Sequence, residues 1–251
     1  GQLPPPLFSV TEDAPPLPVP ALSTYTANRE ALQAATGYAG FLTALPDADG
    51  VIRRAPLLLR HGDGLYPALA LEAARIYLLS EQPRLLTTDL GAAAAIEGID
   101  LGGGRIIPTD AAGRVLVPYR GPSGSFTRVS AAAVLQGEFT PADIVNRIAL
   151  IGTSALALAD LKATPVQSVY PGVEVHANLL AGILAGRFPH EPSTSIIIPS
   201  QDDQVFISED RWQSLVIVTR RIAESYPAIV AFACLAVGIY AAKELAPPDG
   251  P

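Results

Sequence analysis

The chain has 251 residues and a formal net charge of −7, so it offers no basic stripe for phosphates, and nucleic acid is excluded as a partner. Apolar residues make up 49% of the sequence and charged residues only 16%, which indicates a buried core together with a contact with membrane lipid. The single cysteine, Cys234, excludes an internal disulfide framework and a metal cage built from cysteines.

The first 27 residues are rich in proline, which fixes φ and removes an amide donor, so residues 1–27 are predicted to be extended. Such a segment can serve as a linker or lie over a partner surface. A short helix is predicted over 28–35, followed by two strands at 41–45 and 51–59 around a turn at 47–50.

Alternating carboxylates in that turn, Asp47 and Asp49, could begin a calcium loop. However, Arg53 and Arg54 follow at once and would repel a cation. We therefore favour a turn in which the two aspartates form structural ion pairs with the two arginines, and we expect no metal.

The remaining elements follow from hydrophobic periodicity and turn signals. In chain order they are a helix over 67–79, β-rich segments over 84–119, a short helix over 130–135 with Ser130 as N-cap, a buried parallel strand over 144–151 and a helix over 173–186. A strand, a glycine-containing loop and a helix in that order indicate an α/β layered domain, which we place at residues 28–190.

Beyond the domain, residues 191–224 have the composition of a linker and residues 243–251 form a tail. Residues 225–242 contain no charge over 18 positions, which is about 27 Å of helix and enough to cross a hydrocarbon core. We predict a single C-terminal transmembrane helix here, and a buried core helix is the alternative.

Two loops carry candidate binding residues. Tyr119, Arg120 and Phe126 place a cation and aromatic rings in one glycine-containing loop, which suits a small molecule or a partner surface but also fits an ordinary turn. Thr153 and Ser154 follow Gly152, where backbone amides can hold an anion, and Asp160 lies further along the same loop; a tight structural turn is the alternative reading.

His176 lies two residues after Glu174, so the two side chains share a face on a strand and diverge on a helix. A metal site would need more ligands than the chain places nearby, so we favour a histidine bonded to a backbone carbonyl over a proton sensor. No catalytic triad, carboxylate pair or dinucleotide fingerprint is present, so we predict a non-catalytic protein without a cofactor.

Five segments together resemble the CHASE2 family of bacterial sensor domains over about residues 40–186. They are residues 46–54 (PDADGVIRR), 66–75 (YPALALEAAR), 152–155 (GTSA), 160–165 (DLKATP) and 170–178 (YPGVEVHAN). The resemblance implies an extracytoplasmic α/β sensor domain, followed by membrane helices and a cytoplasmic output domain such as a nucleotide cyclase or a kinase. It also implies a further α/β half ahead of the proline-rich segment.

Two functions remain open. The first is a membrane-anchored, single-pass sensor or ligand-binding module on the periplasmic or extracellular side that acts through a partner or output domain; whether it takes a small-molecule ligand is left open. The second is a docking subunit of a larger membrane complex, in contact with other protein subunits or with a second copy. Arginines before the predicted span favour a cytoplasmic location for the domain. The resemblance implies the extracytoplasmic side instead, and we adopt that side.

Overall fold

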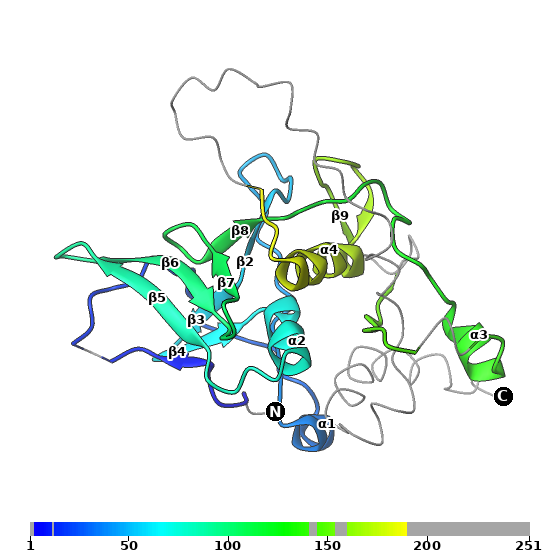
Figure 1. The fold of residues 1–251 in the computed structure, drawn as a ribbon, viewed down its shortest axis with the longest axis horizontal. Helices are drawn as coiled ribbons and strands as arrows, with labels where there is room; N and C mark the ends of the chain where they lie inside the picture. The colour runs from blue at the N-terminus through cyan, green and yellow to red at the C-terminus, as the bar shows by residue number, and fades with distance from the viewer. Residues whose placement is uncertain (1–2, 12, 141–144, 154–159, 190–251) are drawn as a thin grey trace, which may run out of the picture.

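The structure, a computed structural model, describes residues 3–11, 13–140, 145–153 and 160–189 (Figure 1). Within this part the chain mixes helices with small sheets, and every pairing between named strands is antiparallel. The strands are β1 (Phe8–Ser9), β2 (Arg54–Pro56), β3 (Leu58–His61), β4 (Gly64–Pro67), β5 (Arg84–Asp89), β6 (Ala94–Asp100), β7 (Ile106–Pro108), β8 (Arg114–Leu116), β9 (Leu161–Lys162) and β10 (Tyr170–Pro171). The helices are α1 (Glu30–Thr36), α2 (Leu69–Tyr77), α3 (Ala131–Gln136) and α4 (Gly172–Ala185).

Two three-stranded sheets form most of the strand layer. In the first sheet β3 and β4 make a hairpin around a turn at 61–64, and β1 pairs with the free edge of β4. In the second sheet β5, β6 and β7 follow one another, with a register shift between Leu86 and Thr87. The pairs β2–β8 and β9–β10 complete the strands, so the α/β class is present without the predicted parallel sheet.

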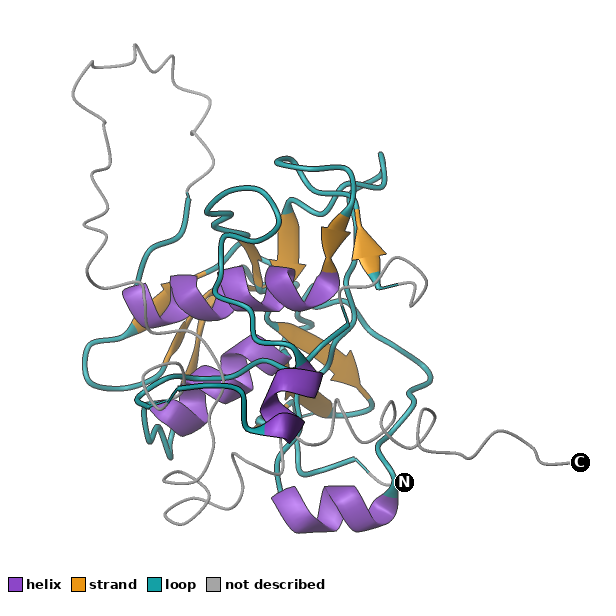
Figure 2. Ribbon diagram, turned by 90° about the vertical axis from the view of Figure 1, so that its right-hand side faces the viewer, coloured by secondary structure: helices purple, strands orange, loops and turns teal. Residues whose placement is uncertain are grey.

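Helices α2 and α4 pack against each other and lie beside the two three-stranded sheets, with β9 on the far side of α4 in Figure 1 (Figures 1 and 2). The buried residues of α2 are Ala70, Leu71, Glu72 and Ala74, and all three residue types have high helix propensity. Helix α4 is apolar over most of its surface, as expected for a helix covered on several sides. The central core joins both helices to the sheets through Leu57, Leu58, Leu65, Leu71, Ile96, Ile99, Tyr170, Leu179 and Leu180.

The proline-rich segment lies along the first sheet rather than apart from the domain. Leu7 N donates to Leu65 O at 2.9 Å, and further along the segment Arg60 N donates to Pro20 O, also at 2.9 Å. Val19 is buried in the core. Prolines lack amide donors, but their carbonyls still accept, and this lets an extended segment cover a sheet edge.

Two of the predicted strands do not form. Phe41 makes a single isolated bridge with Ala68, and the rest of 41–45 has no strand partner. Residues 145–151 pass over the core without strand pairing, although Ala149 is buried as the pattern predicted. Ile148 and Leu150 pack against the core, and apolar contact of this kind requires no strand ladder.

The predicted helices at 28–35, 67–79, 130–135 and 173–186 are all present, with ends shifted by a few residues. Ser130 caps α3 as predicted, since its hydroxyl accepts from Ala133 N at 3.0 Å. Among the described residues no helix is both long and apolar enough to span a bilayer. The predicted linker (191–224), span (225–242) and tail (243–251) lie outside the described residues.

Candidate functional site

Helix α4 presents two chemically different faces. Glu174 and Asn178 are four residues apart, so they lie on one face, and both are buried. His176 lies between them in sequence and points to another side of the helix, where it lines a cavity. The side chains of Glu174 and His176 therefore diverge, as expected for a helix and not for a strand.

The Glu174 carboxylate holds the loop that precedes α3. It accepts from Gly124 N at 3.0 Å and from the Ser123 hydroxyl at 3.3 Å, and it forms an ion pair with Arg128. A buried carboxylate is stable only when such donors replace its water shell. The Glu174 carboxylate is therefore occupied by structural hydrogen bonds and an ion pair and does not form an open binding site.

Asn178 has no exposed surface and links three segments of the chain. Its carbonyl oxygen accepts from Arg120 N at 3.0 Å, and its amide nitrogen donates to the Tyr170 hydroxyl at 2.9 Å and to Glu174 O at 2.7 Å. The hydrogen-bonding capacity of this side chain is therefore largely used inside the domain.

The candidate residues Tyr119, Arg120 and Phe126 belong to this framework and do not line the main cavity. The Tyr119 hydroxyl donates to Ile52 O at 2.8 Å, and its ring meets the Tyr170 ring edge-on at 5.6 Å. The Arg120 guanidinium lies over the buried Phe126 ring, 5.0 Å from its centroid. Burial raises the pKa of Tyr119 and lowers that of Arg120.

A cavity of about 390 Å³ lies between α2 and α4, and we call it the α2–α4 cavity. Residues 39–44 and 148–153 form much of the remaining wall, and Ile52, residues 54–56, Asp160 and Lys162 also contribute. The lining is mostly apolar, with a few polar side chains, and both its volume and its composition are typical of small-molecule sites. The polar and charged lining residues are Asn28, Thr43, Arg54, Tyr77, Thr153, Asp160, Lys162 and His176.

Two predicted site residues, Thr153 and Asp160, therefore reach this cavity, whereas Ser154 lies outside the described residues. Asp160 is placed by the start of α4: its backbone oxygen accepts from Gly172 N at 2.8 Å, and its carboxylate occupies the space that a Cβ at position 172 would need. Lys162 Nζ lies 3.2 Å from the same carboxylate. Gly152 approaches α4 closely as well, since a Cβ there would stand 2.5 Å from Val173 Cβ.

His176 is a partly buried side chain in the cavity wall, and its Nδ1 atom is shielded from solvent and has no hydrogen-bond partner. Burial lowers the pKa of His176 below its ordinary value; nearby Asp160 opposes this shift, and Lys162 adds to it. A hydrogen bond with the backbone of Leu42 favours the protonated ring to a smaller extent. The imidazole is consequently neutral at neutral pH.

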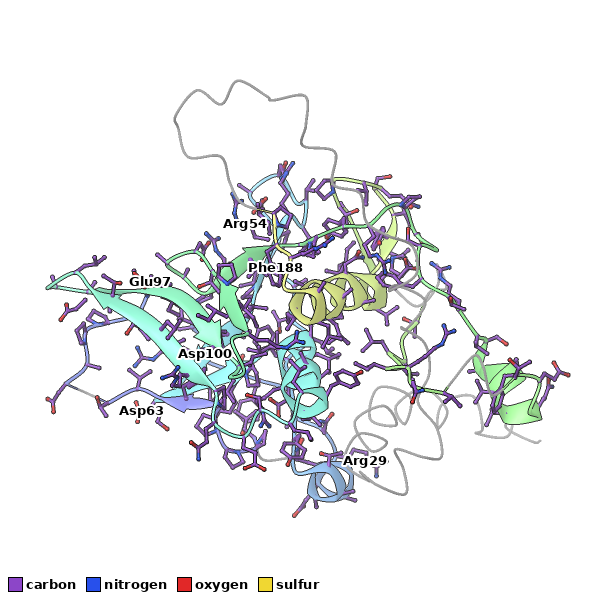
Figure 3. The ribbon with its side chains drawn as sticks, viewed as in Figure 1. Arg29, Arg54, Asp63, Glu97, Asp100 and Phe188 are labelled. Carbon is purple, nitrogen blue, oxygen red and sulfur yellow. The ribbon has the colours of Figure 1, made fainter. Side chains whose placement is uncertain are left out.

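The predicted ion pairs of the 47–50 turn lie at the outer surface. Arg53 contacts Asp49 at 2.8 Å and Asp47 at 3.2 Å, and Arg54 contacts Asp47 at 3.4 Å. The hydrogen bonds from Arg53 lower the pKa of Asp49 to about 2. Arg54 also borders a second, smaller cavity of about 200 Å³ with Phe188, and Figure 3 labels both residues near the end of α4.

A comparison with protein families bears on these features. The profile described as the CHASE2 domain matches residues 9–219. The chain belongs to the CHASE2 family. No curated protein and no solved structure matched the chain in the other two comparisons.

The family match begins within the proline-rich segment, which agrees with the position of that segment on the first sheet. CHASE2 domains are extracellular sensory domains, and this supports a sensory role for the chain. The described residues contain no group of three or more side chains suited to hold a metal ion.

Several residues of the CHASE2 motif at 170–178 have a structural explanation. Tyr170 and Asn178 are buried in one hydrogen-bonded pair, and Gly172 leaves room for the Asp160 carboxylate. The sequence predicts neither the cavity nor a binding role for His176. Helices α2 and α4 are separated by about 100 residues, and no local sequence pattern reveals that they pack together. The i, i+4 spacing of Glu174 and Asn178 was the one available sign of a shared face.

Proposed function

We propose that this CHASE2 domain is a non-catalytic, membrane-anchored sensor on the extracytoplasmic side, which binds a small molecule in the α2–α4 cavity and acts through a partner or output domain. The observation that carries the proposal is the cavity itself, with its volume of about 390 Å³, its apolar walls and its few polar side chains. The sensory character of the family and the apolar stretch at 225–242 support the same role.

The position of the α2–α4 cavity in the fold suggests how ligand binding is transmitted to the rest of the chain. The cavity wall includes α4, which ends at Ala185 and is capped by Gly186; in the sequence the predicted span follows further on. A ligand that contacts both α2 and α4 favours one spacing of the two helices, and a shift of α4 is transmitted to the segment that follows it.

Labelling in intact cells tests the side of the membrane. Leu135 is 88% exposed, so a Leu135→Cys chain that also carries Cys234→Ala offers one accessible thiol. We expect a membrane-impermeant maleimide to label this chain before lysis and the chain to sediment with membranes. Labelling only after lysis would place the domain in the cytoplasm and refute this part of the proposal.

The alternative function, a docking subunit of a membrane complex, is favoured by α3. This helix buries none of its residues, and Leu135 on it is almost fully exposed. For a docking subunit we expect cross-links from Leu135→Cys to a second protein chain and no saturable small-molecule binding. For the sensor we expect saturable small-molecule binding in the assay described below.

A further inference from the structure

The charges on the wall of the α2–α4 cavity are balanced by partners. The Lys162 ammonium lies 3.2 Å from the Asp160 carboxylate, and the Arg54 guanidinium lies 3.4 Å from Asp47. His176 is neutral near pH 7 because burial lowers its pKa. Among the described residues, the charged groups on the cavity wall are therefore paired, and they leave no excess charge with which to attract an ion.

The walls beyond these groups are apolar. Helix α2 contributes Leu69, Ala73 and Ile76, and α4 contributes Val173, Val175 and Leu179. The segments 39–44 and 148–153 add no titratable side chain. A charged ligand would lose its water shell here without gaining a counter-ion, which is strongly unfavourable.

This reasoning rests on the proposed sensory function and identifies the class of ligand. We propose that the α2–α4 cavity binds an uncharged, mostly apolar small molecule, and that binding weakens in acid because His176 forms part of the wall.

The acid dependence follows from the position of His176. Its Nδ1 atom has no partner, so a proton bound there would have to be solvated by water that enters the cavity. An apolar occupant displaces such water and so disfavours the protonated ring. Asp160 and Lys162 are the charged groups that act on the ring, and they are paired with each other; Arg54 and Tyr77 are the other titratable groups of the cavity wall.

Two probes with one skeleton test the class of ligand. N-phenyl-1-naphthylamine is uncharged, and 8-anilino-1-naphthalenesulfonate adds a sulfonate to the same rings; both fluoresce when they leave water. Each is titrated into the full chain in membranes. Because both also partition into lipid, binding is counted as the saturable difference between the native chain and a chain with Ala73→Trp, whose indole fills the cavity. Ile76→Trp is a second blocking variant, and circular dichroism and thermal unfolding confirm that each variant is folded.

We expect the uncharged probe to bind at least about tenfold more tightly than the sulfonate, and both blocking variants to lose this binding. We also expect its affinity to fall as the pH is lowered from 7.5 to 5.0, and the affinities at these two pH values to become equal in a His176→Phe chain.

The outcomes separate the two levels of the argument. If the native and blocked chains bind the uncharged probe equally, the cavity is not the ligand site, and the proposed function and the inference are both wrong. If blocking abolishes binding but the sulfonate binds as tightly, the proposed function stands and the ligand class is wrong. An equal loss of affinity in acid with His176→Phe refutes the role given to the histidine.

Discussion

Replacing Asn178 with leucine tests whether α4 holds the 119–128 loop. Leucine has a similar volume but forms no hydrogen bond, so the Arg120 amide loses an acceptor at 3.0 Å and the Tyr170 hydroxyl loses a donor at 2.9 Å. A buried group left unsatisfied costs about 1–3 kcal/mol, and the second lost bond about 1 kcal/mol. Glu174 O remains a helix acceptor, so its bond adds little. We expect the free energy of unfolding to fall by about 2–4 kcal/mol.

Urea denaturation measures this change as a lower midpoint with an unchanged slope, and thermal unfolding should show a melting temperature about 4–16 °C lower. Leu135→Ala is the control, because that side chain is 88% exposed and its loss should cost less than about 0.5 kcal/mol. Hydrogen exchange of the Arg120 amide should accelerate in the Asn178 variant. A loss of stability below about 0.5 kcal/mol with that amide still protected would show that the network does not hold the loop.

Three further changes test separate parts of the structure. Gly172→Ala places a Cβ against the Asp160 carboxylate, so urea denaturation should show a loss of about 1–3 kcal/mol, and an unchanged midpoint would contradict the close approach. Arg53→Met removes the donors that lower the pKa of Asp49 to about 2, so an NMR titration should show this pKa rising toward 3.8; a value that stays near 2 would assign the shift to another group. The pKa of His176 is lowered in the folded state, so the unfolded chain takes up a proton first and stability falls as the pH drops below about 6.5; His176→Phe should reduce this fall, and an identical pH profile would exclude the histidine as its source.

Local signals in the sequence predicted the elements that depend on nearby residues. The turn at 47–50, the Ser130 cap and the end of α4 before Gly186 all follow from residue types within one or two turns of chain. For the same reason α2 could be located from its apolar spacing, although its ends differ by a few residues from the prediction.

The two predicted strands that do not form show what an apolar sequence pattern cannot predict. Apolar runs at 41–45 and 144–151 fit strands, but a strand also needs a neighbour with free backbone groups, and sequence alone does not reveal whether one is present. Phe41 finds one partner at Ala68, and Ala149 is covered by contacts with other elements instead. An apolar run therefore predicted burial correctly and the type of element incorrectly.

The candidate site residues lie in two separate places in the structure. Thr153 and Asp160 reach the α2–α4 cavity, while Tyr119, Arg120 and Phe126 support the framework behind α4. An exposed aromatic and a buried one look alike in sequence, and only the packing of α4 against the loop distinguishes them. His176 was recognised as a residue that needed a partner, but its place in a cavity depends on α2, which is distant in sequence.

The proposed sensory function depends most on a ligand occupying the α2–α4 cavity. The side-chain nitrogen resonances of ¹⁵N-histidine in the full chain report directly on this occupancy. On addition of N-phenyl-1-naphthylamine we expect the His176 signals to shift and its pKa to fall further, while the signals of His61, which contacts Leu22 O and not the cavity, stay in place. His176 signals that remain unchanged at saturating probe would contradict the assignment of this cavity as the sensory site.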